Sequence, residues 1–205
     1  WMEMMKKKVD IIIKAIKENW DKVFVYSDVD IQFFKKTKKT IIEFIKNKDM
    51  VIQRNTSYGS LCAGFFAARG NNKNLCIWQD IRKDLDLNRD KHDQDYLNLK
   101  LLYLKYVTKN IFRKNNQTES KNKYGIKWSC LPVKFYSPLS NLKMSKALLC
   151  GLSASLGLTK GFLWKTGTTL HVPKNIVLHH ANSVLTVSDK ILQLDYVKNV
   201  INKNK

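Results

Sequence analysis

Two aspartates one residue apart give the strongest chemical signal in this sequence. Asp28 and Asp30 interrupt a run of β-branched and aromatic residues over positions 23–34, and such a run predicts a buried strand. Side chains at positions i and i+2 of a strand point to the same side, so both carboxylates should face one point. Buried carboxylates are costly without a compensating cation. The pair therefore predicts a Mg²⁺ or Mn²⁺ site, with helix caps or surface turns as the structural alternative.

The chain is strongly basic, with 205 residues and a formal net charge of +20. A charge of this sign suits nucleic acid, an anionic membrane surface or a substrate that carries phosphates. Lysine greatly outnumbers arginine and no arginine-rich motif appears, so a general compositional bias is the preferred explanation. The length and the 44% hydrophobic content predict a single globular domain over residues 1–205.

The cysteines indicate a reducing compartment. They are widely spaced, without the short spacings of metal ligands, at Cys62, Cys76, Cys130 and Cys150. We therefore expect buried thiols and a cytoplasmic location. No stretch approaches the roughly 18 apolar residues of a membrane helix. Because the sequence begins at Trp1, we expect the natural start, and any targeting signal on it, to be missing.

The hydrophobic patterning predicts helices that alternate with strands, which indicates an α/β layered fold. Helices are expected over 2–19, 40–47, 74–85, 93 to about 107, and 188–200, the last with Ser188 as its cap. Strands are expected over 50–53, 61–69, 127–131 and 175–178, with an extended piece over 133–136. The polar stretch 109–124 lacks periodicity and is expected to be a flexible insert.

Three further positions could serve a site. Gly64 lies within a predicted buried strand and permits the close approach of a ligand. Asp93 opens a predicted helix, where capping is its structural alternative. His180 follows a predicted strand that directs it toward a loop; a neutral imidazole suits Mn²⁺, and the alternative is a core histidine.

Five separated segments resemble one family pattern in the right order. They read YSDVD at 26–30, CAGFF at 62–66, DQDYLN at 93–98, LP at 131–132 with Phe135, and HAN at 180–182. This pattern resembles the D-x-D nucleotide-diphospho-sugar transferases, which are GT-A-fold glycosyltransferases similar to plant cell-wall arabinosyl- and xylosyltransferases and to enzymes of large DNA viruses. The resemblance implies a Rossmann-like mixed central sheet flanked by helices. Because a single helix precedes the paired acids here, we expect the N-terminal strands of that fold to be absent.

The resemblance also implies an activity, which is the transfer of a sugar, with retention, from a UDP- or GDP-sugar to a glycan or glycoprotein. A divalent ion, Mn²⁺ or Mg²⁺, would be held by Asp28, Asp30 and His180. Those two acids would also bind the donor, together with Gly64, Asp95 and Asn182. Asp93 and Gln94 would be the catalytic pair at the anomeric carbon, where an amide does electrostatic and positioning work. Lys160 or Lys165 could contact the diphosphate.

Two other classes of protein stay open. The charge and the paired acids also suit a nucleic-acid-binding protein or a metal-dependent nuclease, although two-metal nucleases need further carboxylates at the site. An inactive fragment or scaffold would bind metal without turnover. The family pattern departs at Cys62 and Ala63, where Asn or Thr is usual, so hydrogen bonding to the donor there is in question. On the transferase hypothesis, neither a nucleic-acid partner nor a membrane span is expected.

Overall fold

The computed structural model describes residues 2–55, 61–87, 91–101, 122–138, 164–166 and 168–203. These residues fall into two compact units. Unit 1 comprises Trp1–Ser27, Lys38–Gln53 and Leu61–Cys130, and unit 2 comprises Asp28–Thr37, Arg54–Ser60 and Leu131–Lys205. The chain first passes into unit 2 at Asp28, the first of the paired acids. The expectation of a single domain stays a prediction.

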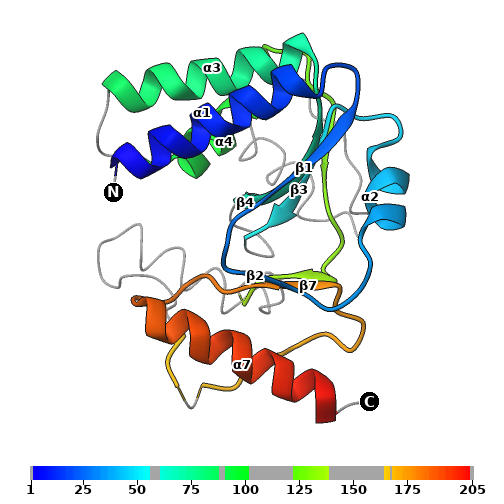
Figure 1. The fold of residues 1–205 in the computed structure, drawn as a ribbon, viewed down its shortest axis with the longest axis vertical. Helices are drawn as coiled ribbons and strands as arrows, with labels where there is room; N and C mark the ends of the chain where they lie inside the picture. Colours follow the sequence, from blue (N-terminus) through cyan, green and yellow to red (C-terminus); the bar gives the residue numbers. More distant parts are fainter. Residues whose placement is uncertain are drawn as a thin grey trace. The chain divides into compact units, whose positions relative to one another are not determined.

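Unit 1 is built on a four-stranded sheet in the order β1-β4-β3-β5. Its strands are β1 (Val23–Ser27), β3 (Met50–Arg54), β4 (Leu61–Arg69) and β5 (Trp128–Cys130). Strands β1, β3 and β4 are labelled in Figure 1. The sheet is mixed, because β1 and β4 pair antiparallel while β3 and β5 pair parallel. Its helices are α1 (Met2–Glu18), α2 (Lys38–Ile45), α3 (Asn72–Leu87) and α4 (Asp93–Lys100).

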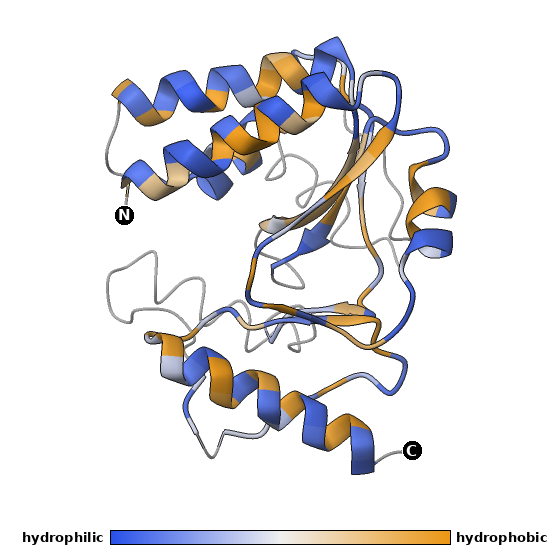
Figure 2. Cartoon of the chain, in the orientation of Figure 1, coloured by the Kyte–Doolittle hydropathy of each residue, from blue (hydrophilic) through white to orange (hydrophobic). Residues whose placement is uncertain are grey.

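The core of unit 1 forms where amphipathic helices meet the sheet. Helix α1 buries one face at three- and four-residue spacing, through Met5, Val9, Ile12 and Ile16, and the hydrophobic and hydrophilic sectors of the helices are visible in Figure 2. On the sheet, Phe66 stacks on Tyr26 and on Trp78, with ring centroids 5.3 Å apart in both pairs. This stack joins β1 to β4 and α3, so the strand that leads to the paired acids is anchored by aromatic burial.

The connection between α1 and β1 crosses the end of β4 at Gly70. Asp21 donates its backbone N–H to the Gly70 carbonyl at 2.7 Å, and Gly70 donates to the Lys22 carbonyl at 2.9 Å. A Cβ atom at position 70 would lie 2.1 Å from the carbonyl oxygen of Asn19. This crossing therefore requires glycine.

Unit 2 is built on a three-stranded sheet in the order β2-β7-β6. Its strands are β2 (Ile31–Phe33), β6 (Phe135–Tyr136) and β7 (Leu178–His180), and helix α7 (Val187–Lys203) contacts β7. Strands β2 and β7 are antiparallel, whereas β6 and β7 are parallel. Among the residues described, one hydrophobic cluster of unit 2 contains Tyr136, Trp164, Leu170, Ile176 and Val197.

The α/β class predicted from the sequence is confirmed, and its strands form two mixed sheets. Several local predictions are wrong. Asp28 and Asp30 lie in the turn between β1 and β2 rather than within a strand, because Val29 is fully exposed and gives a strand nothing to bury. Strand β1 is an edge strand, and Phe24 is its one buried residue. The strand expected over 175–178 is observed as β7, which begins at Leu178 and contains His179 and His180.

Helix boundaries also differ from the prediction. The hydroxyl of Thr186, rather than Ser188, caps α7 by accepting the backbone N–H of Asp189 at 3.0 Å. His92, rather than Asp93, is the N-cap residue of α4. The expected insert lies outside the described residues up to position 121, and so does the expected continuation of the helix from position 102 to about 107. Among the residues described, no helix combines the length and apolar character needed to cross a bilayer.

Candidate metal and donor site

Strand pairing brings the paired acids to the end of β7. In the antiparallel β2–β7 pair Ile31 lies opposite His180, so Asp30, one residue before β2, comes beside that histidine. The backbone N–H of Ala181 donates to the carbonyl of Asp30 at 3.0 Å and extends the pairing past both strands. The main chain therefore fixes the position of Asp30 relative to His180.

Asp28, Asp30 and His180 form a compact cluster in unit 2. Each offers a ligand atom, and these atoms all lie within 4.8 Å of one another. The Nε2 atom of His180 is 3.2 Å from Oδ1 of Asp30, and their side chains are only 6% and 13% exposed. Ligands on opposite sides of Mg²⁺, at about 2.1 Å each, lie about 4.2 Å apart. The two carboxylates suit Mn²⁺ or Mg²⁺, and the imidazole suits Mn²⁺, so the cluster fits a divalent ion after small side-chain adjustments.

A fourth residue, Lys190 on α7, joins this cluster. Its ammonium group forms an ion pair with Oδ2 of Asp30, so both oxygens of that carboxylate face a nitrogen. Burial raises the pKa of Asp30, but the hydrogen bond and charge of His180, followed by those of Lys190, outweigh burial and hold this pKa well below its usual range. Asp30 is therefore an anion ready to bind a cation.

Asn182 and His179 surround the cluster. The side-chain amide Nδ2 of Asn182 donates to Oδ1 of Asn55 at 2.9 Å, and the backbone carbonyl of Asn182 accepts from Nε2 of Gln193 at 3.2 Å. The Oδ1 atom of Asn182 is buried and accepts no hydrogen bond from the described residues. His179 is fully buried against the ring of Tyr136, and this burial lowers its pKa to about 3. His179 is thus a neutral core residue beside the cluster.

The other predicted site residues lie in unit 1, on α4 and β4. The side chain of Gln94 accepts the backbone N–H of Ala63 at 3.2 Å, next to Gly64. Asn98, one helical turn further, accepts the N–H of Leu61 at 2.8 Å and donates to its carbonyl at 3.1 Å. Strand β1 pairs with β4 only as far as Phe65. The side-chain amides of Gln94 and Asn98 therefore bind the first residues of β4, which lie before the residues that pair with β1.

The two acids that flank Gln94 have different surroundings. Asp93 is buried, and its Oδ2 lies 3.0 Å from Nζ of Lys8 on α1. Asp95 is exposed and accepts the backbone N–H of His92 at 3.0 Å, which stabilises the start of α4. Asp93 thus has an ion-pair partner on another helix, and Asp95 has a hydrogen-bond donor within its own helix start.

The remaining predicted residues contribute less. Lys165 is exposed, and Lys160 lies outside the described residues. Cys62 and Cys130 are buried and Cys76 is half-buried, which agrees with thiols in the core for the first two. Sequence reasoning missed Lys190, because one lysine in a lysine-rich chain carries no local signal of a tertiary ion pair.

An α/β chain with mixed sheets is consistent with a GT-A-like nucleotide-sugar transferase fold. The family model described as nucleotide-diphospho-sugar transferase matches residues 1–193. The chain belongs to this family, as its motifs predicted. Searches of the curated proteins and of the solved structures find no significant match.

Proposed function

We propose that this protein is a metal-dependent glycosyltransferase that moves a sugar from a UDP- or GDP-sugar to a glycan or glycoprotein acceptor. The cluster of Asp28, Asp30 and His180 is the observation that carries the proposal, because its ligand atoms already lie within 4.8 Å of one another. Membership of the nucleotide-diphospho-sugar transferase family supports a nucleotide-sugar donor. The metal and the acceptor belong to the proposal.

The residues in and around the cluster divide into metal ligands, a charge partner and a donor contact. Asp28, Asp30 and His180 would hold Mn²⁺ or Mg²⁺, which supplies positive charge to the diphosphate that leaves the sugar. Lys190 balances the charge of Asp30 in the metal-free protein. Asn182 is proposed to bind the donor, and its buried Oδ1, which accepts no hydrogen bond from the described residues, supports that role.

The residues on α4 and β4 are proposed to act at the sugar. Asp93 would bind its hydroxyls and Gln94 would stabilise positive charge at the anomeric carbon, with Gly64 and Asp95 as further donor contacts. Asp93 and Gln94 are already held by Lys8 and by the main chain of Ala63, which fixes their positions. Retention of the anomeric configuration rests on the resemblance of residues 93–98, and nuclear magnetic resonance of the first product tests it.

Thermal unfolding with Mn²⁺ and a panel of UDP- and GDP-sugars tests the proposal. A ligand that binds only the folded protein raises its unfolding free energy, by about 2.7 kcal/mol at a hundred times its Kd. We expect stabilisation by Mn²⁺ and a further, metal-dependent shift with one nucleotide sugar. Release of the nucleoside diphosphate from that donor should follow when an acceptor is supplied.

Two variants with the same change in charge make the test specific. Asp30→Asn should lose both shifts, whereas Asp195→Asn, which alters an exposed acid on α7, should keep them. Equal Mn²⁺ shifts in the two variants would exclude the cluster as the metal site. Absence of any donor shift, together with salt-sensitive binding of mixed-sequence DNA, would favour a nucleic-acid-binding function.

A further inference from the structure

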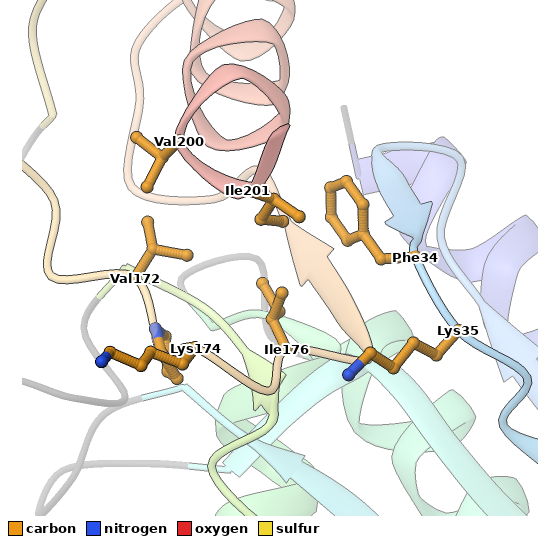
Figure 3. A pocket seen from close by; sticks show the side chains of 8 residues that line it. Phe34, Lys35, Val172, Lys174, Ile176, Val200 and Ile201 are labelled. Carbon is orange, nitrogen blue, oxygen red and sulfur yellow. The ribbon is translucent and has the colours of Figure 1, made fainter. Parts of the chain in front are cut away.

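Unit 2 contains a small pocket at one end of the β2–β7 pair. The cluster of Asp28, Asp30 and His180, called the metal cluster below, lies at the other end. Phe34 and Lys35 follow β2 directly, and both donate backbone N–H groups to the carbonyl of Val177, just before β7. The cavity has a volume of about 120 Å³. Figure 3 shows that apolar side chains from these segments and from the last turns of α7 face one another, namely Phe34, Val172, Ile176, Val200 and Ile201.

The size of the pocket limits what it can hold. An engineered apolar cavity of about 150 Å³ accepts benzene, whereas sites for drug-sized ligands measure about 300–1,000 Å³. A cavity of about 120 Å³ therefore accommodates one apolar side chain and is too small for a nucleotide sugar. A fatty acyl chain would need an elongated tunnel.

The rim of the pocket is positively charged. Lys35 and Lys174 line it, and both are exposed. Within the described part of the chain, neither ammonium group has an acidic partner. Unit 2 has four acidic residues in its sequence, Asp28, Asp30, Asp189 and Asp195; the first two belong to the metal cluster, and Asp189 bonds to Thr186. The rim therefore favours an anionic ligand.

Charge also argues against a second copy of this chain as the occupant. Each copy carries a formal net charge of +20, so a second copy would bring further positive charge toward the two lysines. A ligand that carries carboxylates is attracted instead, because it can form a charge-assisted hydrogen bond with the ammonium groups of Lys35 and Lys174.

We propose that this pocket docks an acidic polypeptide segment of a partner protein. One bulky apolar side chain enters the pocket, and carboxylates on either side of it pair with Lys35 and Lys174. A strand rises about 3.3 Å per residue, so position 34 lies about 13 Å from Asp30 along β2. Docking is thus separate from the metal cluster and does not depend on sugar transfer.

Fluorescence anisotropy tests this inference with a short labelled peptide that has one central leucine between glutamates. The full chain should bind this peptide saturably. A peptide with serine in place of the leucine should bind at least about tenfold more weakly, because burial of a leucine side chain contributes about 1.5–3 kcal/mol. A peptide with glutamines in place of the glutamates should also lose affinity.

Protein variants separate the pocket from general charge attraction. Lys35→Glu combined with Lys174→Glu should raise the Kd at least about tenfold. Lys36→Glu combined with Lys198→Glu makes the same change in charge at exposed lysines that do not line the pocket, and should raise the Kd less than about threefold. Because all four lysines are exposed, circular dichroism should show that both variants fold.

Several results would overturn the inference. One is equal affinity for the leucine and serine peptides. Another is an equal loss of peptide affinity in the two double-lysine variants. A third is binding of phosphatidylserine vesicles without binding of the peptide. Docking should survive Asp30→Asn; loss of docking in that variant would move the peptide to the metal cluster and refute the pocket. Intact docking in a protein without transferase activity would refute only the proposed function.

Discussion

Lys190 forms an ion pair with Asp30, a residue 160 positions earlier in the chain. The lysine side chain is 38% exposed while the aspartate is 13% exposed, so the lysine can turn toward solvent but the carboxylate cannot. An ammonium group and a divalent ion would neutralise the same carboxylate. On the proposed function, Lys190 would therefore compete with the metal for Asp30.

Replacing this lysine should strengthen metal binding. We expect Lys190→Met to tighten Mn²⁺ binding about two- to fivefold in the absence of a donor, as befits a partly exposed ion pair. Isothermal titration calorimetry measures the change, and Lys198→Met on the same helix is the control. Weaker Mn²⁺ binding by Lys190→Met would mean that the lysine orders Asp30 for the metal instead.

Gln94 should contribute to stability whatever its part in the reaction. Gln94→Ala leaves the N–H of Ala63 without the acceptor it has at 3.2 Å, which should lower the unfolding free energy by about 1–2 kcal/mol in urea. Leu99→Ala, at an exposed position of the same helix, should change it by less than about 0.5 kcal/mol. An unchanged stability in Gln94→Ala would show that the bond to Ala63 is dispensable.

Gly70 should tolerate no side chain. A Cβ atom there would lie 2.1 Å from one backbone oxygen and 2.7 Å from another, those of Asn19 and Ile16, so Gly70→Ala must shift the end of α1 and should cost about 3 kcal/mol or more. Gly125 has a positive φ of 66°, and a Cβ atom there would lie in ordinary contact with Cε of Lys73, 4.0 Å away, so Gly125→Ala should cost only about 1 kcal/mol. Urea unfolding of both variants measures the difference, and equal costs would contradict the steric explanation.

His179 should make the protein sensitive to mild acid. Burial lowers its pKa from 6.5 to about 3, so below pH 6.5 the unfolded chain takes up a proton that the folded protein excludes. The stability present above the unfolded pKa is then lost as pH falls, by up to about 1.4 kcal/mol per pH unit.

Urea unfolding in the presence of a metal chelator, between about pH 7 and pH 5, measures this loss. His179→Phe keeps an aromatic ring against Tyr136 and cannot titrate, so its unfolding free energy should depend less steeply on pH. Parallel pH profiles for the two proteins would show that another group takes up the proton.

The sequence predicted best the elements whose hydrophobic pattern is local. The expected helix 2–19 is observed as Met2–Glu18, and the expected strand 61–69 matches β4. Helix α1 buries apolar side chains at helical spacing, and β4 is a continuous apolar run buried on both faces. Both patterns are local in the sequence, so both elements could be predicted from it.

The acidic turn could not be predicted in this way. Valine and isoleucine alternate with the aspartates, which imitates a strand, yet Val29 is exposed and the turn is maintained by the pairing of β2 with β7. The convergence of Asp28 and Asp30 was predicted, but from strand geometry that does not apply there. Their assembly with His180 depends on a tertiary contact that no local pattern encodes.

Helix α7 shows the same limit on its buried face. Apolar residues at helical spacing predict that Ile191 faces inward, but Ile191 is 55% exposed, while Gln193 is fully buried. The amide of Gln193 donates to the carbonyl of Asn182, so a hydrogen bond to the loop after β7 decides which face turns inward. Hydropathy alone ranks isoleucine above glutamine and therefore misplaces these two residues, whereas Val197 is buried as its spacing predicts.

The separation of 160 residues between Asp30 and Lys190 also sets the order in which the ribosome makes the parts of this site. A ribosome adds about 5–20 residues each second, so Asp28 and Asp30 leave it roughly 8–30 seconds before the lysine that neutralises one of them. During that interval the two acids repel each other without the histidine, the lysine or the strand that later hold them. The nascent chain cannot bring His180 beside the two acids until β7 has been made, so this cluster assembles late in synthesis.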